Sequence, residues 1–201
     1  MTLELFTALL AFALVTVITP GPNNFMLMAS GANFGVARSL PHMAGIALGF
    51  PAMVFFVGLG VMSVFDLWPP AYTILRVASA AYLLYLAWKI ATAAPKFESE
   101  SGGRPLTFLQ AAAFQWVNPK AWSMGLSAIT LYAPGRGVSS VLWVAGVYVA
   151  CSLISTSAWT VLGTAIGRLL GAPRRLRIFN IAMAILLVAT LVPVFLAGSA
   201  G

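Results

Sequence analysis

Hydrophobic residues fill long segments of this chain, and short polar stretches separate the segments. Each segment reaches about 20 residues or more, the length with which an α-helix crosses about 30 Å of hydrocarbon. The segments lack the strict alternation of polar and apolar positions that is typical of membrane strands. The pattern therefore predicts an all-α polytopic membrane protein with six transmembrane helices. These helices are expected at about 4–30, 42–63, 70–92, 105–131, 138–166 and 178–198.

The composition indicates that lipid surrounds the chain. It is 61% hydrophobic and 7% charged, whereas soluble domains carry about 25% charged residues. We expect one transmembrane domain over residues 1–201, with the lipid bilayer as a partner. The net charge of +7 does not indicate nucleic-acid binding, because the basic residues are scattered over the loops of a membrane protein. One cysteine and one histidine make no metal site, so we expect no metal and no cofactor.

Lysine and arginine are distributed unevenly between the two sets of loops. The first, third and fifth loops hold Arg38, Lys89, Lys96, Arg104, Arg168, Arg174, Arg175 and Arg177. The other side holds only Arg76 and Arg136, while Lys120 lies inside a span. By the positive-inside rule, the richer side faces the cytoplasm, so both termini are expected to lie outside.

The two halves of the chain share an order of features. In each half an interrupted span is followed by Gly-Val and then by an Ala-Gly pair, Ala44-Gly45 or Ala145-Gly146. Each half has three spans, an odd number, so a repeat between them must be inverted. We expect inverted half-repeats at about 1–92 and 105–198, a 3+3 arrangement in which the first and fourth helices are interrupted. Paired interruptions of this kind point to the binding site of a transporter.

The first span is interrupted by the sequence TPGPNN. Proline costs about 3 kcal/mol inside a helix because it lacks the N–H and clashes with the preceding turn. Pro20, Gly21 and Pro22 are therefore expected to end one half-helix. The carbonyls and amides freed by the break need partners in hydrocarbon. Asn23 and Asn24 are expected to supply these partners, to cap the next half-helix or to bind a solute. The free N–H groups and positive dipole end of such a half-helix suit a carboxylate.

The fourth span is interrupted in the same way by FQWVNPKAW. Pro119 disfavours a helical Asn118 and fits the first position of a new helix, which places Lys120 in its first turn. Gln115 is a further polar group in this apolar segment. None of the four acidic residues lies within a span to neutralise Lys120. A buried charge without a partner indicates a functional site, and an anionic group on the solute is the partner that we infer.

Simpler interpretations stay open for these features. Each proline break is also consistent with a simple kink in a continuous helix. The amine of Lys120 is also consistent with a side chain that extends to the membrane interface. The Gly45/Gly49 pair fits close packing between helices, or a homodimer. His42 fits a structural role or a protonation role. A polar stripe on the fifth span fits either a solute pathway or helix-to-helix hydrogen bonds, and it consists of Ser152, Ser155, Thr156, Thr160 and Thr164.

The two motifs resemble those of the LysE/RhtB family of amino-acid exporters. They are TPGPNNFMLMASGANFGVARSLPHMAGIALG and NPKAW, and the similarity extends over nearly the whole chain. The resemblance implies a multi-pass exporter of amino acids or related metabolites in the bacterial inner membrane, driven by the proton motive force. The family pattern falls on Pro20, Gly21, Pro22, Gly35, Arg38, Gly45, Gly49, Asn118, Pro119 and Lys120.

We therefore predict a secondary transporter that exports amino acids, and neutral ones because no acid lies within a span. Lys120 or His42 is the candidate carrier of the coupling proton. The predicted substrate-binding residues are Pro20, Gly21, Pro22, Asn23, Asn24, Gln115, Asn118, Pro119 and Lys120. The predicted packing or gating residues are Gly35, Arg38, Gly45 and Gly49.

Two other classes of protein stay open. One is a membrane protein that transports nothing and handles lipids or assists assembly, since interrupted helices also occur there. The other is an intramembrane enzyme. The sequence gives this second class little support, because no span holds a carboxylate pair, a histidine-rich metal set, or a serine with a histidine nearby. We therefore predict no catalytic residues.

Overall fold

All regular structure in the described part of the chain is helical. The computed structural model describes residues 2–61, 67–68, 70–93, 103–133 and 137–192. Its elements are α1 (Leu3–Ile18), α2 (Pro22–Phe56), the π-helix η1 (Val57–Val61), α4 (Pro70–Ala91), α5 (Phe108–Gln115), α6 (Pro119–Tyr132), α7 (Val138–Leu170) and α8 (Pro173–Ala189). The predicted all-α fold is confirmed. Among the described residues, the helical segments long and apolar enough to cross a membrane are Pro22–Val61, Pro70–Ala91 and Val138–Leu170.

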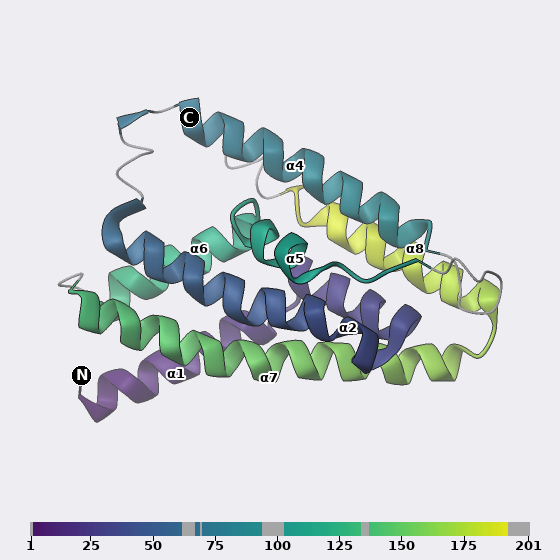
Figure 1. Ribbon diagram of the computed structural model, residues 1–201, viewed down its shortest axis with the longest axis horizontal. Helices are drawn as coiled ribbons and strands as arrows, with labels where there is room; N and C mark the ends of the chain where they lie inside the picture. The colour runs from purple at the N-terminus through teal and green to yellow at the C-terminus, as the bar shows by residue number, and fades with distance from the viewer. Residues whose placement is uncertain (1, 62–66, 69, 94–102, 134–136, 193–201) are drawn as a thin grey trace.

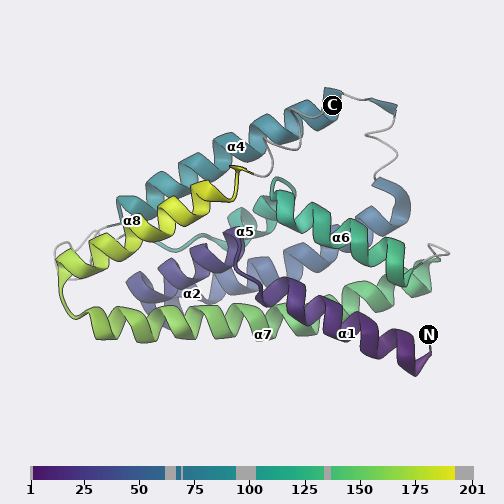
Figure 2. The ribbon, with the colours of Figure 1, turned by 180° about the vertical axis from the view of Figure 1, so that it is seen from behind.

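The helices form one elongated bundle. Helices α1, α2 and α7 run along its length together, and α4 and α8 lie side by side along the opposite edge (Figure 1). The two short helices α5 and α6 lie between these groups, as the view from behind also shows (Figure 2). This arrangement brings the end of α1, the start of α2 and the start of α6 to the middle of the bundle.

Helix α2 reverses its direction at Gly35. Gly35 has φ 77° and ψ 171°, a conformation that glycine adopts readily because it has no Cβ. The hydroxyl oxygens of Ser30 and Ser39 lie 2.8 Å apart, whereas nine residues of straight helix span about 13 Å. The helix therefore has a first limb (22–34) and a second limb (36–56). The loop predicted at 31–41 is wrong except at Gly35, because one glycine suffices for the reversal and the helix satisfies the other backbone groups.

The predicted loop at 167–177 is also largely helical. Helix α7 continues to Leu170, Gly171 adopts the left-handed conformation with φ 58°, and α8 begins at Pro173. Glycine after a helix and proline at the first helical position make this short connection favourable. The first predicted span corresponds to α1 and the first limb of α2, and the second to the second limb of α2 and η1. The third corresponds to α4, the fourth to α5 and α6, the fifth to α7 and the sixth to α8. Lys96, Arg136 and the end of the sixth predicted span lie outside the described residues.

Glycines let the first limb of α2 approach α7 closely. A Cβ at Gly163 would overlap the carbonyl oxygen of Met28, and a Cβ at Gly31 would overlap that of Thr160. On the second limb, Gly45 and Gly49 face α5, where a Cβ at Gly49 would lie 2.6 Å from the Cα of Ala112. The predicted packing role of Gly45 and Gly49 is therefore met inside the chain. Within the chain, α5 covers both glycines.

Replacing Gly163 by alanine is expected to destabilise the protein by about 1–3 kcal/mol, because α2 and α7 must move apart to admit the methyl group. Gly146 on the same helix is the matched control, since a Cβ there meets no atom within 4 Å. Thermal unfolding in detergent measures both variants. Equal unfolding temperatures for Gly163→Ala and Gly146→Ala would contradict this close packing.

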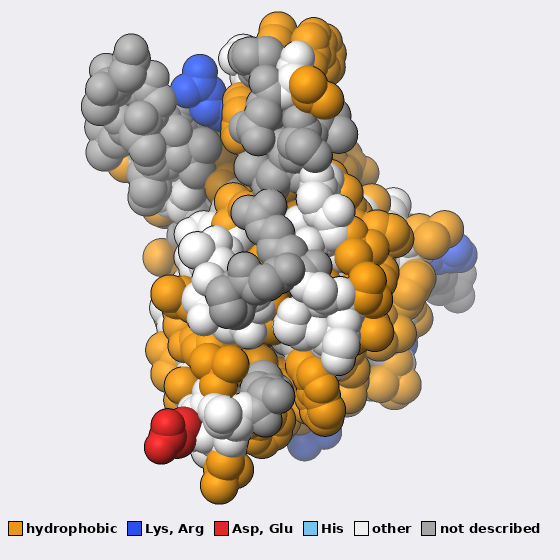
Figure 3. Space-filling view, turned by 90° about the vertical axis from the view of Figure 1, so that its left-hand side faces the viewer, with side chains coloured by type: hydrophobic (Ala, Val, Ile, Leu, Met, Phe, Trp, Pro, Cys, Tyr) orange, Lys and Arg blue, Asp and Glu red, His pale blue; other side chains and the backbone are white. Residues whose placement is uncertain are grey.

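Basic residues from distant parts of the chain gather at one end of the bundle. Arg38, just after the reversal of α2, donates from Nη2 to the carbonyl of Gly103 at 3.2 Å. Lys89 and Arg104 line one cavity, and Arg168 and Gly35 line another. The reversal of α2 and the connection from α7 to α8 both lie toward the right-hand end in Figure 1. Seen from the opposite end, hydrophobic side chains lie mainly toward the flanks, and few charged side chains are in view (Figure 3).

Candidate functional site

The last carbonyl groups of α1 are satisfied by a side chain from beyond the break. The final four carbonyls of a helix have no partner within it, and in a membrane they need one from the protein. Asn24 supplies it, since its Nδ2 donates to the carbonyls of Val17 at 3.0 Å, Ile18 at 3.4 Å and Thr19 at 2.8 Å. The prediction that Asn24 supplies a partner to the freed carbonyls is therefore confirmed, and the alternative N-cap role is wrong. Gly21 is the N-cap of α2, and the Asn24 side chain reaches back to α1.

Helix α7 supplies two further donors to the same carbonyls. Ser155 Oγ donates to the carbonyl of Val17 at 2.8 Å, and Trp159 Nε1 donates to that of Ile18 at 3.2 Å. Ser155 belongs to the predicted polar stripe, whereas the sequence analysis missed Trp159. Its position four residues after Ser155, on the same helical face, was the available signal.

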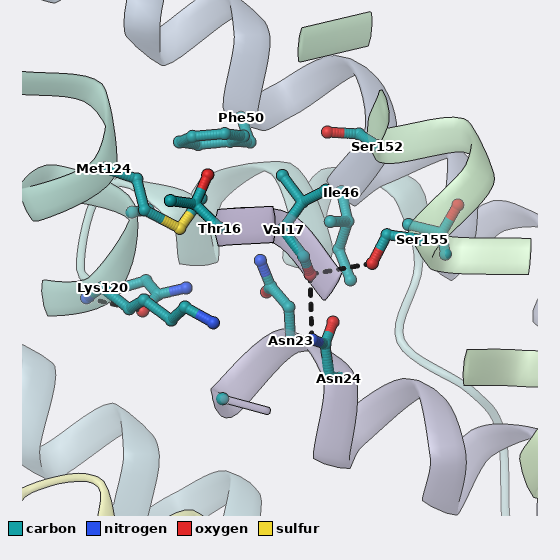
Figure 4. A pocket seen from close by; sticks show the side chains of 14 residues that line it. Thr16, Val17, Asn23, Asn24, Ile46, Phe50, Lys120, Met124, Ser152 and Ser155 are labelled. Atoms are coloured by element: carbon teal, nitrogen blue, oxygen red, sulfur yellow. Dashed lines mark hydrogen bonds between the residues drawn. The ribbon is translucent and has the colours of Figure 1, made fainter. Parts of the chain in front are cut away.

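Lys120 contacts the first break from the first turn of α6. Its Nζ donates to the carbonyl of Thr19, and to that of Pro20 at 3.4 Å. Gly21 leaves room for the lysine, because a Cβ there would lie 2.7 Å from Lys120 Cδ. The half-buried side chain lies across the break in Figure 4. The only acid among the described residues is the exposed Glu4, so carbonyl dipoles hold this amine.

The second break has the predicted local geometry and is bonded to the first. Asn118 is extended and caps α6, its Oδ1 accepting from the Lys120 backbone N–H at 3.1 Å, and Pro119 is the first helical residue. Asn23 Nδ2 donates to Gln115 Oε1 at 2.8 Å, and Gln115 Nε2 donates to Asn23 Oδ1 at 3.1 Å. Gln115 is fully buried, and this paired amide contact joins the two breaks.

A narrow polar cavity lies between the two breaks and α7. Its free volume of about 30 Å³ is enough for one or two water molecules, so an amino acid enters only if these helices move. Its lining comes from α1, both limbs of α2, α6 and α7 (Figure 4). The lining residues are Thr16, Val17, Gly21, Asn23, Asn24, Ile46, Phe50, Asn118, Lys120, Ala121, Met124, Ser152, Ser155 and Thr156.

The structure brings together most of the predicted binding residues. Gly21, Asn23, Asn24, Asn118 and Lys120 line the cavity. Pro20 accepts from Lys120, Gln115 pairs with Asn23, and Pro22 and Pro119 begin the two new helices. Gly35, Arg38, Gly45 and Gly49 lie elsewhere, at the reversal and against α5. Sequence reasoning missed the apolar wall of Val17, Ile46, Phe50, Ala121 and Met124, since nothing distinguishes these residues from other apolar positions.

Two interrupted helices whose breaks meet at one polar site form an arrangement typical of secondary transporters. The chain belongs to the LysE type translocator family, which matches residues 14–197. This confirms the resemblance inferred from the two motifs. It also confirms the prediction of a membrane transporter rather than an enzyme.

Curated relatives match over almost the entire chain. Proteins named cysteine/O-acetylserine efflux protein, from Escherichia coli (strain K12) and from Shigella sonnei (strain Ss046), are each 34% identical over 200 residues. The match covers 97% of this chain and 100% of each relative. The names of these relatives agree with the predicted direction of transport, which is efflux. No solved structure matches the chain.

Proposed function

We propose that this protein exports small neutral amino acids, of the size and polarity of cysteine or O-acetylserine, from the cytoplasm. The observation that carries the proposal is the position of Lys120. Its amine is held between the two breaks by the carbonyls of Thr19 and Pro20, with no acidic side chain beside it in the described structure. A cation in this position offers a site to the carboxylate of a solute.

The site also offers a partner to the ammonium group of an amino acid. The carbonyls at the end of α1 carry the negative end of the helix dipole. When the solute carboxylate draws Lys120 away, the carbonyl of Thr19 keeps its hydrogen bond from Asn24 and can accept a second one from the solute ammonium. Ser152 and Thr156 on α7 present hydroxyls to a short polar side chain. A zwitterionic amino acid therefore replaces the hydrogen bonds between Lys120 and the carbonyls at the break. The side chain of a basic amino acid would find no carboxylate to pair with among the described residues of this site.

We further propose that six helices cross the membrane as two inverted half-repeats, and that one half rocks against the other. The paired breaks and the Asn23–Gln115 contact support a binding site at the interface of the halves. The cavity of about 30 Å³ would then belong to a closed state. Coupling to the proton motive force is part of this proposal, and a protonophore should stop export against a gradient. The homodimer stays a prediction from the sequence.

The gathering of Arg38, Lys89, Arg104 and Arg168 at one end supports a cytoplasmic position for that end. Both termini then lie outside. A fluorescent protein fused after Gly201 should remain dark, because it would be exported unfolded. A fusion that glows in the cytoplasm would reverse this orientation.

An export profile tests the proposed function. Cells that express the protein are loaded with mixed dipeptides, and each free amino acid is followed inside and outside the cells. We expect one or a few small neutral amino acids to leave faster than from cells that express Asn118→Ala at the same membrane level. If no amino acid leaves faster, export is the wrong function, and a lipid-handling membrane protein becomes the better explanation.

A further inference from the structure

A second cavity, of about 460 Å³, lies between the first limb of α2, the end of α4 and the segment 103–106. This volume is in the range of small-molecule sites, unlike that of the narrow cavity between the breaks. Its wall combines apolar and aromatic side chains with polar groups. The polar side chains are Ser30, Asn33, His42, Lys89, Thr92 and Arg104.

His42 is a buried polar side chain of this wall that lacks a partner in the described structure. The residue is 1% exposed, and neither ring nitrogen makes a hydrogen bond there. The neighbouring polar groups are satisfied, since Ser30 lies 2.8 Å from Ser39 and Asn33 pairs with Asn180 at 2.7 Å. Buried polar groups are normally hydrogen-bonded. A neutral imidazole offers one donor and one acceptor. Both nitrogens are covered by neighbouring atoms, so a ligand bonds them only when the ring turns toward the cavity.

Two cations also line this cavity, Lys89 and Arg104. Lys89 lies in the last turn of α4, with its Nζ 5.9 Å from the centre of the Tyr85 ring. Arg104 lies in a segment that Arg38 holds in place through the carbonyl of Gly103. The cavity wall therefore combines two cations with the polar imidazole of His42. This combination suits a small anion or zwitterion.

We propose that this cavity is the cytoplasmic loading site for the exported amino acid, an inference that rests on the proposed function. Lys89 and Arg104 receive the carboxylate, and His42 bonds the amino group or a polar side chain. The cavity and the breaks share the first limb of α2, on which Ser30 lies seven residues, about 10 Å, beyond Asn23. The solute therefore moves along one helix face from the loading site to Lys120. The polar wall at His42 favours a small solute over a lipid chain.

Uptake of labelled O-acetyl-L-serine or L-cysteine into inside-out membrane vesicles tests the loading site, because the cytoplasmic face is then exposed to a known concentration. We expect Lys89→Met to raise the half-saturating concentration about tenfold, with the maximal rate within about twofold of the unchanged protein. His42→Phe, which fills the cavity, should act in the same direction. Arg76→Met removes a cation from the same helix outside the cavity and should leave both quantities unchanged.

The outcomes separate the two proposals. If Lys89→Met and His42→Phe leave the half-saturating concentration unchanged while Lys120→Met stops uptake, the loading site is wrong and the proposed function stands. If His42→Phe does not accumulate, Lys89→Met and Arg104→Met decide the question. If Lys89→Met and His42→Phe lower only the maximal rate, and adding anionic lipid to the vesicles restores that rate, the cavity holds a lipid headgroup. The loading site is then wrong. If the unchanged protein takes up neither amino acid, both proposals fail.

Discussion

Lys120→Met is expected to lower amino-acid export about 100-fold, to the rate of cells without the protein, while the membrane level stays normal. Methionine keeps the length and apolar stem of lysine but removes the amine that bonds the carbonyls of Thr19 and Pro20. Without that amine the carboxylate of the solute loses its charged partner, an interaction worth about 1.5–3 kcal/mol. Export rates from dipeptide-loaded cells, normalised to membrane level, measure the effect.

Arg76→Met is the control for this experiment, since it removes a cation that does not line the cavity between the breaks. Lys120→Arg should restore little activity. The planar guanidinium does not reproduce a compact ammonium, and Gly21 leaves room only for a narrow stem. If Lys120→Met exports at the normal rate, Lys120 does not bind the carboxylate, and the proposed site must move.

Asn24→Leu is expected to destabilise the protein by about 3 kcal/mol and to abolish export. Leucine has a similar volume but cannot donate to the carbonyls of Val17, Ile18 and Thr19 at the end of α1. Losing a donor to buried carbonyl groups costs about 1–3 kcal/mol, and here one side chain serves three of them. The measurement is the temperature at which half of the detergent-solubilised protein is lost from the monodisperse fraction.

Met26→Leu on the same limb is the matched control, because it conserves volume at a buried position and such changes cost less than about 1.5 kcal/mol. An unfolding temperature for Asn24→Leu equal to that of Met26→Leu would show that Asn24 is not needed to close the break. Its three hydrogen bonds would then add no net stability.

Local chemistry made part of the structure predictable. Proline lacks an N–H and disfavours a helical residue before it, so Pro20, Pro22 and Pro119 marked the breaks within a residue or two. The same local rule placed Asn118 outside the helix and Pro119 at the first position of α6. The loop predicted at 31–41 failed for the opposite reason. One glycine can reverse a helix, and the polar residues around Gly35 do not indicate that the other residues of the segment 31–41 are helical.

By itself, the sequence determined that this chain is a helical membrane protein, where two of its helices break, and which family its motifs resemble. These features depend on side-chain hydrophobicity, proline geometry and short motifs, all of which act locally. Only the tertiary structure decided that Asn23 pairs with Gln115, that Trp159 serves α1, and that His42 has no partner among the described residues. The first two contacts join residues 92 and 141 positions apart. Only the packing of α1, α2, α5 and α7 brings such residues together, and no local pattern encodes that packing.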